Sequence, residues 1–229
     1  MNYVCKPLHL LHGLFGIYEN WVENTKILEY AEEIPYLIVF VDAGNSWYSD
    51  NSNIPNHFYE SHFFEEIFPI VEQKFKIGGE RKSRAIGGLS MGGYGAFKFA
   101  LRRPDFFCLA ASMSGAFQIP EIFENKIWHE LQPSINAVFG NNSKLKNHNN
   151  LLKIIENFPD NKIASLPHFY FDCGTEDSFL ENNIDIEKVF QQRKISHEFQ
   201  KVSGGHDWVY WNSRIQQILH KADQIFNKQ

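Results

Sequence analysis

Residues 88–95 read Gly88-Leu89-Ser90-Met91-Gly92-Gly93-Tyr94-Gly95, and this stretch decides the fold. It holds the pattern G-x-S-x-G between a short apolar run and a helix-like pattern. This context is typical of a nucleophile elbow, a sharp strand-to-helix turn that exposes a serine hydroxyl at the carboxyl end of a sheet. Glycines flank the turn because a Cβ there would collide with the neighbouring strand or with the serine. The pattern predicts a nucleophilic Ser90; the alternative is a glycine-rich turn with an ordinary serine.

The composition bounds the fold and the class of partner. The chain has 229 residues, of which 43% are hydrophobic, and we expect one α/β domain over residues 1–229. A formal net charge of -5 without a basic cluster argues against a nucleic-acid partner. No apolar run reaches the length of a membrane span, and residues 1–11 do not read as a signal peptide. We therefore expect a cytoplasmic protein with no membrane partner.

The cysteines Cys5, Cys108 and Cys173 have no spacing that suggests a metal site. Each lies in or beside an apolar run, which predicts buried free thiols and a reducing compartment. We expect a small-molecule substrate and neither a metal nor a cofactor.

Apolar runs alternate with helical patterns along the chain. Strands are predicted at 8–11, 37–41, 85–87, 109–113, 168–173 and 198–202, with helices at 26–32, 58–75, 91–103, 179–192 and the C-terminus. This alternation predicts right-handed crossovers in a mostly parallel sheet flanked by helices. We expect Thr25 to cap the first helix, Pro69 to bend the second and Gly78-Gly79 to end it.

Residues 117–167 interrupt this alternation. They are rich in Asn and Lys, and their helical patterns are broken. We interpret them as an insertion over the strand ends, a lid or a pocket wall, because long irregular segments are usually functional. The alternative is a mobile polar connection without a role.

A serine, a carboxylate and a histidine, the residue types of a nucleophile with its base and acid, follow predicted strands in the order Ser90, Asp177, His206. The carboxyl ends of parallel strands share one rim, so these side chains are expected to meet there. A serine hydroxyl needs an imidazole to take its proton, and the imidazole needs a carboxylate to fix its tautomer. We assign His206 as base and Asp177 as acid, with Glu176 and then Asp207 as rivals for the acid.

Acyl transfer also needs two donors for the developing oxyanion. The N–H of Met91, directly after the nucleophile, is the first candidate. The second is the N–H of Leu14 in the early loop, with Phe15 as the next choice and His12 as a residue that orients the loop. Loop aromatics at Trp47, Tyr48 and Trp208, and less specifically Trp21 and Phe117, are candidates for a substrate pocket. For each of them the alternative is core or lid packing.

The chain resembles the esterase D-type branch of the α/β hydrolases, and within it the small tributyrin and acetyl esterases. Five motifs in order carry the resemblance: Leu11-His12-Gly13-Leu14, Asn45-Ser46-Trp47-Tyr48-Ser49-Asp50, residues 87–95, Cys173-Gly174-Thr175-Glu176-Asp177 and Gly205-His206-Asp207-Trp208. The resemblance implies an α/β-hydrolase fold and serine carboxylester hydrolysis of short acyl chains, acetyl to butyryl. By matched position it implies the triad Ser90, Asp177 and His206 with oxyanion donors Leu14 and Met91.

One departure and three alternatives stay open at this stage. Family members usually carry edge strands before the Leu-His-Gly strand, and here that strand begins almost at Met1. Either the sheet is smaller or the chain is a shortened version, and we expect the uncovered edge to favour a homodimer or to lower the stability. The alternative activities are S-formylglutathione hydrolysis and removal of feruloyl or acetyl groups from plant polysaccharide. The alternative without catalytic activity is an inactive hydrolase fold that serves as a binding module.

Overall fold

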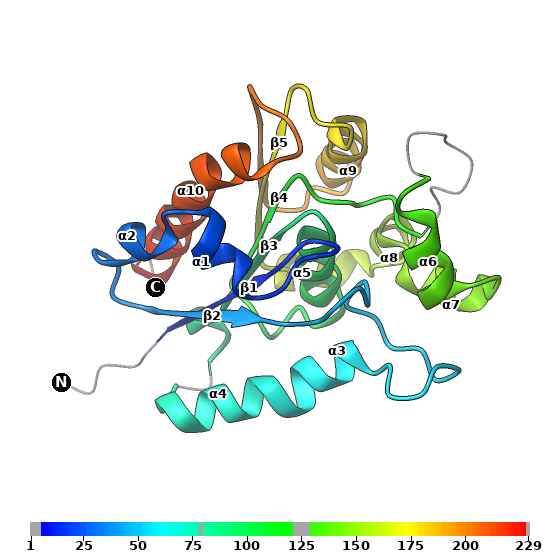
Figure 1. The fold of residues 1–229 in the computed structure, drawn as a ribbon, viewed down its shortest axis with the longest axis horizontal. Helices are drawn as coiled ribbons and strands as arrows, with labels where there is room; N and C mark the ends of the chain where they lie inside the picture. The colour runs from blue at the N-terminus through cyan, green and yellow to red at the C-terminus, as the bar shows by residue number, and fades with distance from the viewer. Residues whose placement is uncertain (1–5, 78–79, 121–128, 228–229) are drawn as a thin grey trace.

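The computed structural model describes residues 6–77, 80–120 and 129–227. Its centre is a six-stranded sheet in the order β2-β1-β3-β4-β5-β6, and every neighbouring pair is parallel (Figure 1). The strands are β1 (Pro7–Leu11), β2 (Leu37–Val41), β3 (Ala85–Leu89), β4 (Leu109–Met113), β5 (His168–Gly174) and β6 (His197–Val202). The parallel α/β architecture predicted from the sequence is confirmed, and the carboxyl ends of all six strands lie along one rim.

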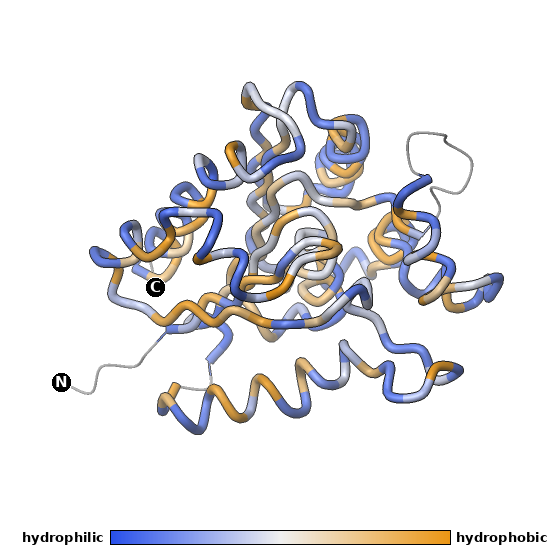
Figure 2. The backbone as a smooth tube through the Cα atoms, viewed as in Figure 1, coloured by the Kyte–Doolittle hydropathy of each residue, from blue (hydrophilic) through white to orange (hydrophobic). Residues whose placement is uncertain are grey.

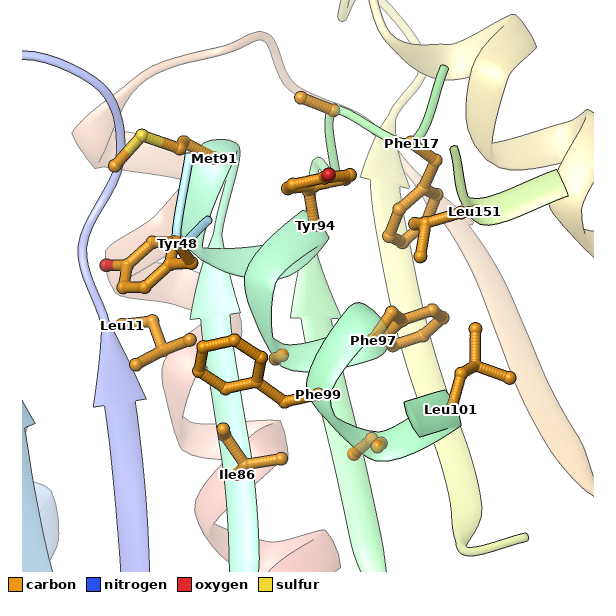
Figure 3. Packing of buried hydrophobic residues seen from close by; sticks show 14 of the residues in the cluster. Leu11, Tyr48, Ile86, Met91, Tyr94, Phe97, Phe99, Leu101, Phe117 and Leu151 are labelled. Atoms are coloured by element: carbon orange, nitrogen blue, oxygen red, sulfur yellow. The ribbon is translucent and has the colours of Figure 1, made fainter. Parts of the chain in front are cut away.

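Helices cover both faces of the sheet (Figure 1). One face carries α1 (Asn20–Asn24), α2 (Ile27–Ala31) and α10 (Trp208–Asn227), which pack on a buried cluster with β3, β4 and β5. The other carries α5 (Met91–Arg102), with α8 (Leu151–Glu156) and α9 (Leu180–Gln192) beside it. Thr25 was predicted to cap α2, but the N-cap of that helix is Lys26, and Thr25 instead ends α1, a helix that was not predicted. The Thr25 Oγ1 still accepts from the Ile27 N–H at the start of α2. Figure 3 shows Phe97 and Phe99 of α5 packed over the sheet.

Helix α5 lies unusually close to the sheet because its first turn has no side chains in the way. A Cβ at Gly92 would collide with the carbonyl of Leu11 on β1, and one at Gly93 would collide with Ser112 on β4. A residue larger than glycine at either position would push the helix away from the strands. The glycines after the serine therefore fix how deeply the amino end of α5 is set into the rim.

The helix predicted at 58–75 is confirmed with one irregularity. It consists of α3 (Tyr59–His62), a π-helical turn (Phe63–Ile67) and α4 (Phe68–Phe75), and Figure 2 shows apolar and polar residues alternating along it. The wide turn comes directly before Pro69, which has no N–H to continue the helical hydrogen bonds. The helix ends at Lys76, which has a left-handed φ of 51°. The proposed Gly78-Gly79 stop lies outside the described residues.

The described part of the insertion is helical and fastened to the rest of the molecule. It contains α6 (Gln132–Phe139), α7 (Ser143–Asn149), α8 and a 3₁₀ turn (Asp160–Ser165). The Arg193 guanidinium, just after α9, donates to the carbonyls of Ile155, Glu156 and Phe158 at the end of α8. The Trp47 indole donates to Ser134 Oγ on α6 at 3.2 Å. These contacts join each end of the helical segment to the rest of the fold.

Candidate active site

Ser90 stands at the strand-to-helix junction in a strained backbone conformation. Its φ of 53° and ψ of -115° lie in a region that non-glycine residues rarely adopt. The surrounding structure holds this conformation, because the Ser90 N–H donates to the Met113 carbonyl and the Ser90 carbonyl accepts from Tyr94 and Ala116. Ser90 is 8% exposed, and it lines a cavity at the rim. This geometry is that of a nucleophile elbow.

A continuous chain of hydrogen bonds runs from this hydroxyl to a buried carboxylate. Ser90 Oγ lies 3.0 Å from His206 Nε2, and His206 Nδ1 lies 2.9 Å from Asp177 Oδ2. Asp177 Oδ1 also accepts from the Phe179 N–H at 2.8 Å, which fixes the carboxylate. The imidazole can thus take a proton from the hydroxyl while the carboxylate holds Nδ1–H in place.

Electrostatics keep the Asp177 side chain ionised. Burial raises its pKa, but hydrogen bonds from His206 and Ser114 outweigh burial and hold the pKa below its usual value. The two rival acids lie elsewhere: Glu176 is exposed, and Asp207 Oδ1 accepts from the Tyr210 N–H at the start of α10. The structure therefore brings together Ser90, His206 and Asp177 rather than either rival.

The loop after β1 presents the second candidate oxyanion donor. The Ala43 N–H donates to His12 Nε2 at 3.0 Å, so Nδ1 carries the proton and donates to the Gly13 carbonyl at 2.7 Å. In a trans peptide the N–H points opposite to the carbonyl, so the Leu14 N–H faces away from the His12 ring. The Phe15 N–H is occupied by Asn45 Oδ1 at 2.8 Å. Leu14 therefore remains the candidate donor on this loop, and Met91, the first residue of α5, remains the other candidate.

A cavity of about 360 Å³ opens beside Ser90. Its walls come from the early loop, the elbow, the insertion and the loop of His206, and its apolar lining includes Leu14, Phe15, Leu131, Phe179, Trp208 and Trp211. The His206 ring contacts Phe179 and Trp211, each at 4.9 Å between ring centroids. Phe179 and Trp211 were not predicted, although both lie within five residues of a triad candidate in sequence.

Of the aromatic residues predicted to bind substrate, one lines the cavity and four are buried in the fold. Trp208 lines the cavity, as expected. Trp47 and Tyr48 are each 1% exposed and are not among the described residues that line it. Trp21 and Phe117 are fully buried. For these four residues the packing alternative holds, because their rings belong to the buried hydrophobic clusters of the fold.

Two further absences hold for the described residues. No group of three or more His, Cys, Asp or Glu side chains within ranges 6–77, 80–120 and 129–227 is arranged to hold a metal ion. None of the described helices combines the length and apolar content needed to cross a membrane. Cys108 and Cys173 are buried free thiols, as predicted, and Cys5 lies outside the described residues.

Comparisons with known proteins agree with this architecture. A family model described as putative esterase matches residues 2–222. An acetyl esterase from Caldicellulosiruptor saccharolyticus is 30% identical over 215 residues, which cover 92% of this chain and 80% of the relative.

Two solved structures superpose closely. A ferulic acid esterase gives a TM-score of 0.81 at 29% identity, over 97% of this chain and 85% of its own. An S-formylglutathione hydrolase from Staphylococcus aureus gives a TM-score of 0.80 at 27% identity, over 95% of this chain and 84% of its own. The chain therefore belongs to the putative esterase family, in the esterase D-type branch of the α/β hydrolases, and it is a serine esterase.

Proposed function

We propose that this enzyme hydrolyses carboxylic esters with short acyl chains, acetyl to butyryl, through Ser90, His206 and Asp177. The observation that carries the proposal is the unbroken hydrogen-bond chain from Ser90 Oγ through His206 to Asp177 at the wall of a cavity. The same geometry argues against an inactive binding module, because such a module would have no need of an aligned base and carboxylate.

The reaction follows from the roles that these atoms can take. Ser90 Oγ attacks the acyl carbonyl while His206 Nε2 accepts its proton, and the oxyanion is bound by the N–H groups of Met91 and Leu14. The protonated imidazole then gives its proton to the leaving alcohol, and Asp177 stabilises the imidazolium. Water, activated by His206, attacks the acyl-enzyme and releases the acid.

The cavity supports a preference for small acyl groups. A volume of about 360 Å³ must hold both the acyl group and part of the alcohol. Its lining includes the bulky side chains Trp208, Trp211 and Phe179, which restrict the space near His206. The acetyl esterase relative points in the same direction.

A second candidate is thioester hydrolysis of the S-formylglutathione type. It is favoured by the S-formylglutathione hydrolase neighbour, whose fold covers 95% of this chain. A formyl group is smaller than an acetyl group, so the cavity accommodates either. The ferulic acid esterase neighbour makes feruloyl esters the third substrate to test.

Substitution of Ser90 by alanine tests the chemistry. We expect Ser90→Ala to lower kcat for p-nitrophenyl acetate by at least about 1,000-fold without unfolding, since the nucleophile is gone. The measurement is initial-rate kinetics, with circular dichroism as the control for folding. A fluorophosphonate probe should label the native protein and not the variant. Retained turnover in Ser90→Ala would reject the proposed mechanism.

A panel of substrates tests the specificity. We expect kcat/KM to be highest for acetyl to butyryl p-nitrophenyl esters and to fall at least about tenfold for octanoyl, since a single methylene that a pocket cannot accommodate already costs about 1–3 kcal/mol. S-formylglutathione and methyl ferulate complete the panel. A larger kcat/KM for S-formylglutathione than for every ester would replace the ester proposal with the thioester one.

We also propose a cytoplasmic location. It is supported by the free, buried thiols of Cys108 and Cys173, which suit a reducing compartment.

A further inference from the structure

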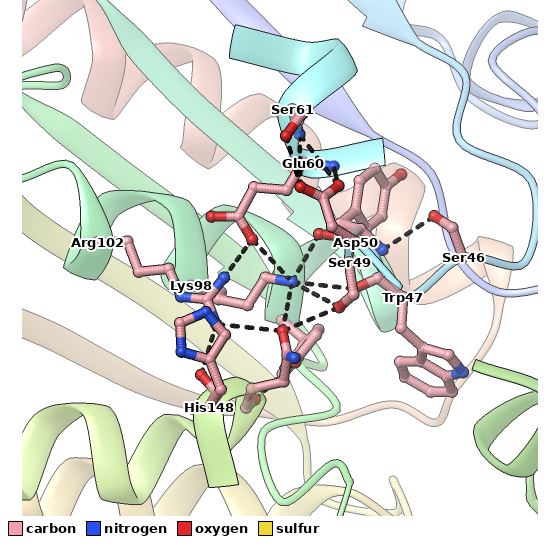
Figure 4. Close-up of polar contacts among 12 residues, drawn as sticks. Ser46, Trp47, Ser49, Asp50, Glu60, Ser61, Lys98, Arg102 and His148 are labelled. Atoms are coloured by element: carbon pink, nitrogen blue, oxygen red, sulfur yellow. Dashed lines mark hydrogen bonds and ion pairs between the residues drawn. The ribbon is translucent and has the colours of Figure 1, made fainter. Parts of the chain in front are cut away.

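Lys98 is a charged side chain buried under the active-site rim. It lies on α5, two turns after Met91, and is 0% exposed. Its Nζ donates to the Tyr48 carbonyl and to Ser49 Oγ, both at 2.6 Å, and to Asn149 Oδ1 at 3.2 Å (Figure 4). Burying an amino group is costly unless its donors are satisfied, so this arrangement needs a reason.

The Lys98 amino group can make its two shortest hydrogen bonds in either protonation state. Burial lowers the pKa of Lys98 to about 7, against the opposing effect of the Glu60 carboxylate 3.5 Å away. An ammonium has three N–H donors and a neutral amine has two, so the two shortest bonds, to Tyr48 and Ser49, persist in both forms.

These bonds hold a strained turn. Trp47 and Tyr48 have φ values of 53° and 49°, a left-handed conformation that costs non-glycine residues about 1 kcal/mol or more each. Lys98 Nζ lies 3.4 Å from the Trp47 carbonyl and 2.6 Å from the Tyr48 carbonyl, so both carbonyls converge on it. The Ser49 hydroxyl donates to the Trp47 carbonyl at 2.8 Å. Lys98 is therefore the group around which this turn closes.

The turn delivers the Tyr48 hydroxyl to the oxyanion loop. The hydroxyl donates to the His12 carbonyl at 2.9 Å, one residue before Gly13 and two before Leu14. The ring lies against α5 at Gly95, where a Cβ would come within 2.6 Å of Tyr48 Cδ2. Burial raises the pKa of Tyr48 well above its usual value, so the phenol stays a donor throughout the neutral range.

We propose that Tyr48 is a positioning residue of the oxyanion hole, and that Lys98 holds Tyr48 in place. Helix α5 carries one oxyanion donor, Met91, at its first residue, and through Lys98 and Tyr48 it also fixes the loop that carries the other, Leu14. The distance between the two donors is thus set by a single rigid unit. The inference rests on the proposed function, because it assigns a role within that same site.

Tyr48→Phe tests the inference by removing only the hydroxyl. Loss of an entire oxyanion donor costs about 100- to 1,000-fold in kcat, and a misplaced donor should cost less. We expect Tyr48→Phe to lower kcat for p-nitrophenyl acetate about tenfold and to change KM less than about twofold, because the lost contact acts mainly in the transition state.

The diagnostic measurement uses the matched thiono ester, in which sulfur replaces the carbonyl oxygen. Sulfur is larger and a weaker acceptor, so well-placed donors favour the oxygen ester. We expect the ratio of kcat/KM for the oxygen ester to that for the thiono ester to fall in Tyr48→Phe. A merely structural defect would lower both rates and leave this ratio unchanged.

Tyr94→Phe is the matched control. Tyr94, on α5, is buried like Tyr48. Its hydroxyl donates to the backbone carbonyl of Asn149 at 2.7 Å and not to the oxyanion loop. We expect a comparable loss in melting temperature and an unchanged oxygen-to-thiono ratio. Equal ratios in Tyr48→Phe and the native enzyme, or an equal fall in Tyr94→Phe, would overturn the inference.

Lys98→Met tests the second link. We expect it to lower the same ratio, and we expect the double variant with Tyr48→Phe to show no greater fall, because both changes act through one contact. A further, multiplicative fall in the double variant would separate Lys98 from Tyr48. Ester hydrolysis by the native enzyme and its loss in Ser90→Ala test the proposed function separately from these ratios.

Discussion

His9 lies on β1 with no exposed surface, in contact with the rings of Phe63 and Phe68, whose centroids are 5.4 and 5.5 Å from its own. Burial lowers its pKa from 6.5 to about 4. The unfolded chain therefore takes up a proton before the folded one as the pH falls, and the folded state loses stability between pH 6.5 and 4. The loss is at most about 3 kcal/mol at 1.36 kcal/mol per pKa unit.

We predict that His9→Leu flattens this acid dependence. The free energy of unfolding, measured by urea denaturation at pH 7 and pH 4, should fall more in the native protein than in His9→Leu. His220→Leu, on the exposed side of α10, is the control and should follow the native protein. Parallel losses in native protein and His9→Leu would show that another group governs the acid limb.

At the level of single residues, the triad candidates could be predicted because each follows a strand and carries a hydroxyl, carboxylate or imidazole group suited to acyl transfer. The positions of the Trp47 and Tyr48 side chains could not be predicted. Their motif indicates a loop near the rim, but the direction of the rings depends on Lys98, about 50 positions away in the chain. Sequence pattern alone does not reveal such a contact, and a lysine within an apolar helix is its only visible sign.

At the level of elements, α10 is anchored beneath the His206 loop by a buried ion pair. Asp172 on β5 is fully buried and accepts from Arg214 Nε at 3.1 Å and from the Tyr210 hydroxyl at 2.7 Å. Burial raises the pKa of Asp172, and Arg214 opposes that effect. Tyr210 in turn packs against Gly204, two residues before His206. The pair thus links the sheet to the loop that carries the base.

We predict that Arg214→Met destabilises the fold by about 3 kcal/mol or more, because it leaves a buried carboxylate without its counter-charge. The double variant Asp172→Asn/Arg214→Met should be more stable than Arg214→Met alone, since the orphan charge is then removed. Urea denaturation of the native protein, the single variants Arg214→Met and Asp172→Asn, and the double variant gives the coupling free energy. Purely additive losses would contradict this account of the pair.

The elements themselves were predictable where a simple period dominates. Most of the strands are apolar runs, and all six came out within one or two residues of their predicted bounds, as did α9. The C-terminal helix was predicted from its helical spacing without a starting residue. Helix α1 was missed because five residues are too few to show a period. The π-helical turn was missed because Pro69 indicates a bend without specifying how the preceding turn widens.

At the level of the whole molecule, the parallel direction of the strands was predicted from the alternation of strands and helices, whereas their order in the sheet is known only from the structure, because no local pattern specifies it. Strand β2 forms one edge of the sheet, with β1 as its partner among the described residues. The homodimer expected from an open edge stays a prediction. Light scattering on the purified protein would test it, and a monomer mass at micromolar concentration would count against it.

The hydrogen bonds that hold helices α6, α7 and α8 of the insertion in place have a consequence for substrate specificity. Ser134 is hydrogen-bonded to Trp47, Asn149 to Tyr94 and the end of α8 to Arg193, so an outward movement of the described helices would break buried or partly buried hydrogen bonds. These bonds favour a fixed pocket wall over a lid that opens and closes. Ester substrates then bind in a cavity that is already formed in the free enzyme. Substitution of Leu131 or Phe179, which line this cavity, should change its shape, and with it the choice of substrate, without affecting any closing movement.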